Sequence, residues 1–230
     1  MPAFDDTAAR LRACRLCRDS PLYGPPLPQE PRPIVQGSAT ARLCIASQAP
    51  GTRAHRTGQP FTDPSGVRLR AWLGLDEARF YDPARVAIVP MGSCFPGLDA
   101  KGGDRPPRRE CAERWRAELF SGLPELELIL VIGQYAQGWH LGRMEGGLTG
   151  TVRRWREILA EPRRPPGPAP APPVLAQQRL AEARALVRGG AAAGAARRGG
   201  AGDGGVRGRA GIDVAGVPRD RCRDPRRTRR

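Results

Sequence analysis

Apolar and polar residues alternate in blocks along the first 160 residues of the chain. Apolar runs with the length of buried strands lie at 41–47, 85–89 and 126–132. Apolar residues at helical spacing lie at 5–14, 65–73, 108–120, 135–141 and 151–160. In the second of these helices we expect the core face to carry Val67, Leu69, Trp72 and Leu73. Strands that alternate with helices predict an α/β fold, with a central parallel sheet covered by helices on both faces.

Each predicted strand leads into a segment that is typical of a loop. These segments are QAPG at 48–51, GSCFPG at 92–97 and GQYA at 133–136. Ligands of open parallel sheets bind at the carboxyl ends of the strands. We therefore expect the functional site to lie where these three segments meet.

Residues 161–230 have a different composition from the rest of the chain. They contain no Phe, Trp or Tyr and are rich in Pro, Ala, Gly and Arg. Such a composition buries too little apolar surface to offset the conformational entropy of the chain. We therefore expect an ordered domain at 1–160 and a disordered tail at 161–230, with at most an isolated helix near 174–188.

The formal net charge of +15 is unevenly distributed. Residues 161–230 carry 16 Arg and 6 acidic residues, whereas residues 1–160 carry 22 basic and 17 acidic residues. The domain alone is mildly basic, which permits a nucleic-acid partner without requiring one. No apolar run is long enough to cross a membrane, and the first residues lack a secretory signal pattern. We expect a cytoplasmic monomer with no membrane partner.

Four cysteines have the spacing of a ligand set. Cys14 and Cys17 form a C-x-x-C pair, Cys94 lies in a Gly/Pro turn, and Cys111 lies at the start of a predicted helix. Four thiolates suit a tetrahedral zinc ion or an iron–sulfur cluster. The alternative is four unrelated buried thiols. Cys44 lies in an apolar run and is expected in the core, and Cys222 in the arginine-rich tail is expected to be incidental.

The segment SQAPGTRAHRTGQPFTDPSGVRLRAWLG at 47–74, together with LILVIGQYA at 128–136 and the four cysteines, resembles the uracil-DNA glycosylase superfamily. The resemblance is to its iron–sulfur, family four type, and covers roughly residues 8–160. It implies a three-layer α/β/α sandwich and a [4Fe–4S] cluster on the four cysteines. It also implies a base-flipping hydrolase that removes uracil, or a related damaged base, from DNA.

The resemblance also suggests roles for several residues around the QAPG turn. Phe61 is similar to the ring on which the flipped base stacks, although plain core packing is an equal alternative. The backbone amides of the turn, around Pro50 and Gly51, can hold a water molecule or the leaving base. Gly51 lets that backbone approach a ligand closely.

The chain departs from the superfamily pattern at the positions where catalytic groups are expected. Gln48 stands where a glutamate is usual, and an amide can orient a water molecule but cannot act as a base. Ala54 and His55 replace an acidic pair, so His55 is a candidate for charge or proton transfer, or is a solvated loop residue. Pro90 stands near the position of the asparagine that reads uracil. We retain Gln48 and His55 as the catalytic candidates.

The superfamily closes its site with a late strand ending in H-P-S and a final helix, neither of which is evident here. We therefore expect the C-terminal strand and helix to be missing. Translating residues 170–196 one base later, with suitable synonymous codons, gives an H-P-S tripeptide, three Trp, a Phe and an amphipathic helix. We infer a frame change between about Ala160 and Pro170; the alternative is a genuine basic tail.

Three functions remain open from the sequence. The first is a uracil-type DNA glycosylase, which the QAPG turn, Phe61 and the cysteines favour. The second is a non-catalytic iron–sulfur protein that binds nucleic acid, which the missing carboxylates and the missing H-P-S favour. The third is a structural module that binds zinc.

Overall fold

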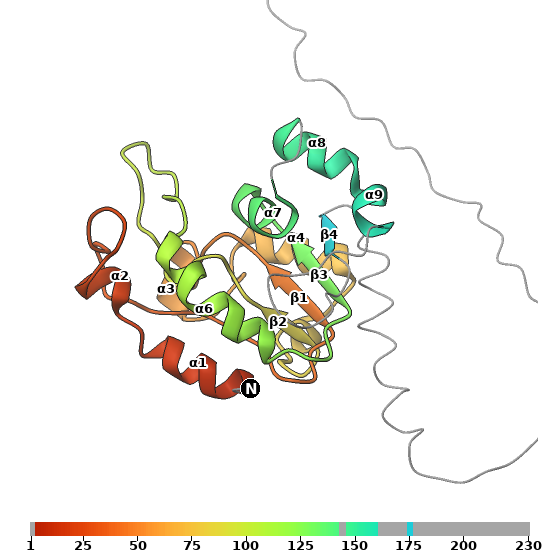
Figure 1. Ribbon diagram of the computed structural model, residues 1–230, viewed down its shortest axis with the longest axis horizontal. Helices are drawn as coiled ribbons and strands as arrows, with labels where there is room; N and C mark the ends of the chain where they lie inside the picture. Colours follow the sequence, from red (N-terminus) through yellow and green to blue (C-terminus); the bar gives the residue numbers. More distant parts are fainter. Residues whose placement is uncertain (1–2, 143–145, 161–173, 177–230) are drawn as a thin grey trace, which may run out of the picture. The chain divides into compact units, whose positions relative to one another are not determined.

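The computed structural model describes residues 3–142, 146–160 and 174–176 (Figure 1). In chain order its elements are α1 (Phe4–Arg12), α2 (Leu16–Asp19), β1 (Leu43–Ala46), α3 (Thr52–Thr57), α4 (Pro64–Leu73), α5 (Glu77–Phe80), β2 (Val86–Ile88), α6 (Arg109–Ser121), β3 (Leu128–Val131), α7 (Gln134–Leu141), α8 (Gly147–Arg153), α9 (Trp155–Ala160) and β4 (Val174–Ala176). The alternation of strands and helices is the one that the apolar pattern predicts.

The strands form one parallel sheet in the order β2-β1-β3-β4. In register, Leu43 of β1 lies between Val86 of β2 and Leu128 of β3. All residues of β1, β2 and β3 are buried, as expected for strands covered on both faces. The short apolar runs of the sequence therefore correspond to central strands.

Alternate strand residues point into two separate cores. One core lies between the sheet and α1, α6 and α7, and contains the side chains of Cys44, Ala46, Ala87, Val89, Ile129 and Val131. The other lies between the sheet and the helices α4 and α5, and contains Leu43, Ile45, Val86, Ile88, Leu128 and Leu130. Figure 1 shows the sheet between these two sets of helices. The fold is the expected three-layer α/β/α sandwich, and Cys44 is a core residue as predicted.

Two details of the predicted helices need correction. The buried positions of α4 are Gly66, Leu69, Arg70 and Leu73, which follow the helical i, i+3, i+4, i+7 spacing. Val67 and Trp72, expected in the core, are 59% and 40% exposed because they fall on the other side of the helix. The predicted helix at 151–160 is divided into α8 and α9 at Arg154. The short helices α2, α3 and α5 were not predicted.

The expectation that the sheet lacks its C-terminal strand is wrong. β4 lies inside the predicted tail and pairs in parallel with β3, with Ile129 opposite Val174 and Val131 opposite Ala176. The physical reason is that β3 would otherwise present an unpaired edge, which the apolar V-L-A triplet can cover. Three further expectations lie wholly or mainly outside the described residues: the absence of a final helix, the possible helix near 174–188 and the incidental role of Cys222. Within the described helices, none has the length and apolar character needed to cross a membrane.

Candidate active site and cysteine cavity

A cleft lies at the carboxyl ends of β1 and β2, where the QAPG turn leaves the sheet. Its volume is about 170 Å³, and a cavity of about 150 Å³ can hold a benzene ring. The residues that line it are Ile34, Ser47, Ala49, Pro50, Gly51, Ala54, Pro60, Phe61, Asp63, Ser65, Ile88, Pro90 and Asp104. Three predicted base-binding residues, Pro50, Gly51 and Phe61, thus line one cleft that is large enough for a six-membered ring.

Phe61 has an unusual backbone conformation. Its φ of 56° is the one positive value at a non-glycine residue of the described chain, and such a conformation persists only where surrounding contacts impose it. The Phe61 carbonyl accepts hydrogen bonds from Arg70 Nη1 at 3.1 Å and Tyr81 Oη at 3.2 Å. A Cβ atom at Gly66 would come within 1.8 Å of this same carbonyl oxygen. The first turn of α4 therefore requires glycine so that Phe61 can lie against it.

The Phe61 ring contributes to both the cleft and the core. It lines the cleft and also makes an edge-to-face contact with Phe80, at a centroid distance of 6.0 Å. Arg70, which holds the Phe61 carbonyl, is itself fixed by Glu77 at 2.8 Å. The two interpretations of Phe61 from the sequence are therefore compatible, since its ring packs against Phe80 in the core and the residue also lines the cleft.

The two catalytic candidates from the sequence do not line this cleft. The Gln48 side chain lies against Gly133, where a Cβ atom would come within 2.6 Å of Gln48 Cδ. His55 lies on α3 with its ring 5.8 Å from that of Phe95. Its pKa is lowered by burial and by the nearby Arg32, so the ring is held in the neutral form. Neither Gln48 nor His55 is among the residues that line this cleft, and their catalytic roles stay predictions.

Two carboxylates in the cleft were missed by the sequence analysis. Asp63 caps α4, and its Oδ1 accepts hydrogen bonds from the Gly66 amide at 3.1 Å and the Ser65 hydroxyl at 2.5 Å. The D-P-S sequence at 63–65 is a helix-start signal that could have located this cap. Asp104 lies in the loop after β2, and no local pattern marks it. Its pKa is raised by burial and by the charge of Asp63.

Pro90 also lines the cleft. This is the residue that stands near the position where the resemblance led us to expect an asparagine. The buried guanidinium of Arg116 on α6 supports this edge, because Nη1 donates to the carbonyls of Val89 and Pro90, at 3.1 Å each. Arg116 Nη2 also contacts His140 Nε2 on α7. A buried cation thus fixes the backbone where β2 enters the site.

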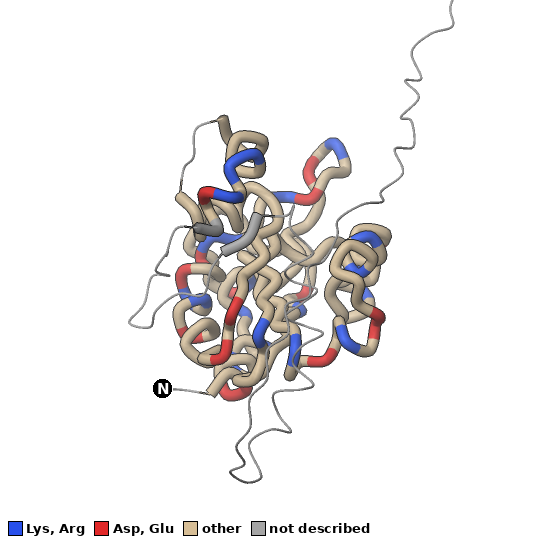
Figure 2. Tube along the Cα trace, turned by 90° about the vertical axis from the view of Figure 1, so that its right-hand side faces the viewer, with Lys and Arg blue, Asp and Glu red and all other residues tan. Residues whose placement is uncertain are grey.

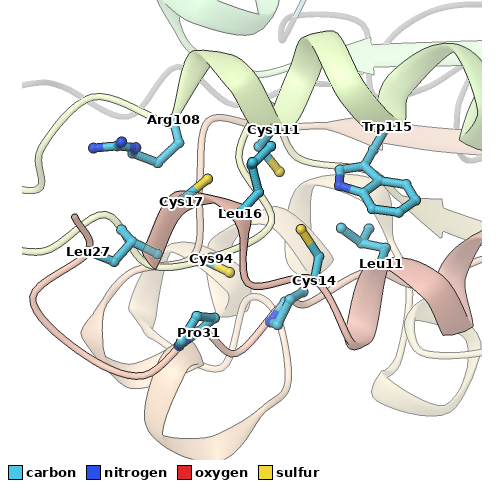
Figure 3. Close-up of a pocket in the computed structure, with 11 residues that line it drawn as sticks. Leu11, Cys14, Leu16, Cys17, Leu27, Pro31, Cys94, Arg108, Cys111 and Trp115 are labelled. Atoms are coloured by element: carbon cyan, nitrogen blue, oxygen red, sulfur yellow. The ribbon is translucent and has the colours of Figure 1, made fainter. Parts of the chain in front are cut away.

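The four predicted ligand cysteines surround one small cavity (Figure 3). Cys14 and Cys17 come from the α1–α2 junction, Cys94 from the turn after β2, and Cys111 from the first turn of α6. Leu11, Leu27 and Trp115 complete its apolar wall, and Arg108 lies beside it. Cys44 is not among the lining residues. The fold thus brings three distant segments together and leaves their sulfur atoms facing the same space.

The environment of these thiols is apolar but contains donors for sulfur. Burial raises the pKa of Cys17 and of Cys94 to about 12, so these groups are protonated unless a metal binds them. The Ser93 amide donates to Cys111 Sγ at 3.3 Å. None of the five cysteines in the described chain forms a disulfide. The described residues also contain no group of three or more His, Cys, Asp or Glu side chains arranged around one metal ion.

Charged residues of both signs are interspersed along the described chain (Figure 2). Several of them form exposed pairs, such as Arg15 with Asp19 and Arg109 with Glu113. Exposed pairs of this kind contribute little to stability. The charge pattern therefore gives no strong indication of a partner by itself.

Comparison with known protein families gives a match to the model of the uracil DNA glycosylase superfamily over residues 34–185. The matched region is more than half of the chain and contains every cleft residue, Cys94 and Cys111, whereas Cys14 and Cys17 precede it. It also continues past residue 160 and includes β4. The α/β/α fold and the cleft at the carboxyl edge agree with this match. The chain belongs to the uracil DNA glycosylase superfamily.

Proposed function

We propose that this protein is a DNA glycosylase that hydrolyses the bond between uracil, or a related damaged base, and deoxyribose in DNA. The observation that carries the proposal is the cleft of a superfamily member, large enough for one pyrimidine ring and lined by Phe61 and the QAPG turn. A glycosylase must receive a base that has been rotated out of the DNA helix. A compact cleft with one aromatic wall meets that requirement.

The cleft residues have separate roles in this reaction. Phe61 stacks on the flipped base, and the hydrogen bonds to its carbonyl hold its backbone in the positive-φ conformation. The backbone of Pro50 and Gly51 approaches the base or the attacking water without an intervening side chain. Departing uracil carries negative charge, and fixed backbone dipoles near it lower the barrier.

The four cysteines would hold a [4Fe–4S] cluster in this proposal. The donor set fits, because four thiols face one cavity and the Ser93 amide already donates to one sulfur atom. A single zinc ion needs every sulfur within about 2.3 Å of one point, whereas a cluster spreads the four thiolates over separate irons. When bound, the cluster would fasten α2, the turn at Cys94 and α6 to one another and so would have a structural role.

A non-catalytic protein that binds uracil-containing DNA is the second candidate. It is favoured by one observation, the amide of Gln48 where a carboxylate is usual, with its side chain turned toward Gly133. The two candidate functions predict different products when the protein is mixed with uracil-containing DNA. A binder retains uracil DNA without releasing the base, whereas a glycosylase leaves an abasic strand.

The proposal is tested with Phe61 variants and uracil-containing single- and double-stranded oligonucleotides. Phe61→Leu preserves apolar contact with Phe80 but removes the flat ring, so folding should be retained. We expect uracil binding to weaken by about 1–3 kcal/mol, the typical value of one base–aromatic stack. An oligonucleotide with thymine in place of uracil serves as the control. Equal uracil release by wild type and Phe61→Leu would remove the stacking role.

We also infer that the chain beyond about residue 160 results from a change of reading frame. The composition of residues 177–230 supports this inference, while β4 and the reach of the family match to residue 185 limit how much of the tail it explains. Sequencing the gene around codons 158–172 tests it directly. If the frame is as given, the basic tail is native, and its removal should alter DNA affinity and its salt dependence.

A further inference from the structure

The loop between β2 and α6 is folded so that it presents one carboxylate to the cleft. An antiparallel bridge joins Leu98 to Asp104, and the Arg105 amide donates to the Gly97 carbonyl at 2.9 Å. Asp99 organises the turn between them, because its Oδ1 accepts from the Lys101 and Gly103 amides at 2.8 and 2.9 Å. Asp104 therefore has a defined position although it lies on a loop.

The Asp104 carboxylate faces the QAPG turn directly. A Cβ atom built at Gly51 would lie 3.4 Å from Asp104 Oδ2. Both residues line the cleft together with Phe61. Asp104 therefore shares one cleft with the residues to which the proposed function assigns the base and the attacking water.

The two cleft carboxylates differ in what they can do. Asp63 Oδ1 is engaged by the Gly66 amide and the Ser65 hydroxyl. Asp104 makes no hydrogen bond or ion pair through its side chain within the described chain, and its side chain is open to the cleft. Asp63 and Asp104 are the only titratable side chains in the described lining. Asp104 is thus the cleft carboxylate with no side-chain hydrogen bond on either oxygen within the described residues, whereas Asp63 Oδ1 is held at the start of α4.

We propose that Asp104 is the general base of the glycosylase reaction and supplies from the β2–α6 loop the carboxylate that Gln48 lacks. This inference rests on the proposed function. Asp104 accepts a proton from a water molecule held at the QAPG turn while the water oxygen bonds to C1′ of the deoxyribose. The C1′–N1 bond breaks, its electron pair leaves with uracil, and the uracil anion takes up a proton from solvent. Asp104 then returns its own proton to solvent, leaving an abasic strand with a hydroxyl at C1′.

The pH profile follows from this role. A general base must be deprotonated, and burial and Asp63 hold the pKa of Asp104 above its ordinary value. The rate should therefore rise with pH as Asp104 loses its proton. Asp63→Asn removes the neighbouring charge while an asparagine still caps α4, so the rise in rate should occur at lower pH. Asp104→Asn should abolish this rise.

The experiment compares wild type, Asp104→Asn and Glu125→Gln under single-turnover conditions, with binding to the uracil oligonucleotide measured separately. Glu125 is an exposed carboxylate before β3, at the opposite end of the sheet, and serves as the matched control. We expect Asp104→Asn to lower the rate constant by about 100-fold or more, with DNA affinity and melting temperature unchanged. Glu125→Gln should behave as wild type.

The outcomes separate this inference from the proposed function. If wild type releases uracil and Asp104→Asn does so within threefold of its rate, Asp104 is not the base, while the glycosylase assignment stands. If the variant loses DNA affinity in proportion to its rate, Asp104 is a binding residue and the inference is overturned. If wild type releases no uracil, the proposed function fails and this inference fails with it.

Discussion

The cysteine cavity and the cleft are assembled from the sequence in opposite ways. The cavity gathers four side chains of a single type from the start, middle and later part of the domain. The cleft is built mostly from one continuous segment, 47–65, with a wall added from β2 and the β2–α6 loop. Four residues of one rare type are recognisable in a sequence, whereas a cleft depends on how loops of common residues fold.

The two regions also differ in electrostatics. The thiols lie among Leu11, Leu27 and Trp115, and burial raises the pKa of Cys17, Cys94 and Cys111 and so opposes their ionisation. The cleft is open and holds a carboxylate whose pKa is raised but which remains accessible. Thiols with raised pKa ionise when a metal binds them, which agrees with the cluster proposed for the first region, whereas the second region holds a carboxylate that can exchange protons with water.

The largest effect should come from removing a cysteine ligand. Under the proposed cluster assignment, Cys111→Ala should lose iron and much of its soluble yield, because the segments around the cavity would no longer be fastened by the cluster. Iron per chain and the visible absorption of the purified protein measure this. Cys44→Ala is the matched control, a fully buried thiol in β1 away from the cavity, and should keep its iron. Equal iron in Cys111→Ala and wild type would contradict the ligand set.

Gly66→Ala should come next, because the added Cβ would meet the Phe61 carbonyl at 1.8 Å. The Phe61 carbonyl cannot move aside as a flexible side chain can. We therefore expect a loss of about 3 kcal/mol in the free energy of unfolding, near the upper end for overpacking. Urea titration measures it. Gly138→Ala in α7, where nothing lies within 4 Å of the added atom, should instead gain about 0.5–1 kcal/mol. A well-tolerated Gly66→Ala would refute the close packing of Phe61.

Arg116→Met should weaken the edge of the cleft formed by β2. It leaves the carbonyls of Val89 and Pro90 without their donor, which we expect to cost about 1–3 kcal/mol of stability. Thermal unfolding compared with Arg114→Met checks the value. Arg114 lies on the same helix but is half exposed and paired with Glu118, so its replacement should change stability by less than about 0.5 kcal/mol. Similar effects in both variants would argue against a special role for Arg116.

Tyr81→Phe should have the smallest effect and bear on Phe61 alone. The Tyr81 hydroxyl donates to the carbonyls of Pro60 and Phe61, at 2.9 and 3.2 Å. Its loss should reduce stability by about 1 kcal/mol and raise KM for uracil DNA more than it lowers kcat. Tyr23→Phe, which removes an exposed bond to Glu113, should leave KM unchanged. An unaltered KM in Tyr81→Phe would show that the hydrogen bonds from the Tyr81 hydroxyl do not position the Phe61 ring.

The strands and most helices could be predicted because their apolar periods are clear, and the cysteines and Phe61 because short motifs carry them. β4 was missed because three residues of modest apolarity gain their structure only from the open edge of β3. Asp104 was missed because its place depends on the fold of the β2–α6 loop around Asp99, which no local pattern describes. The contact of the Gln48 side chain with Gly133 could not be predicted, because it depends on how two strand ends meet in the sheet.

The most direct test of the account is a measurement of free uracil released from a strand containing one uracil, beside an identical strand containing cytosine. The full chain purified with its iron should release uracil in equal amount to the abasic strand formed, and should leave the cytosine strand intact. Tight binding of the uracil strand with no free uracil would contradict the glycosylase assignment and favour the non-catalytic binder.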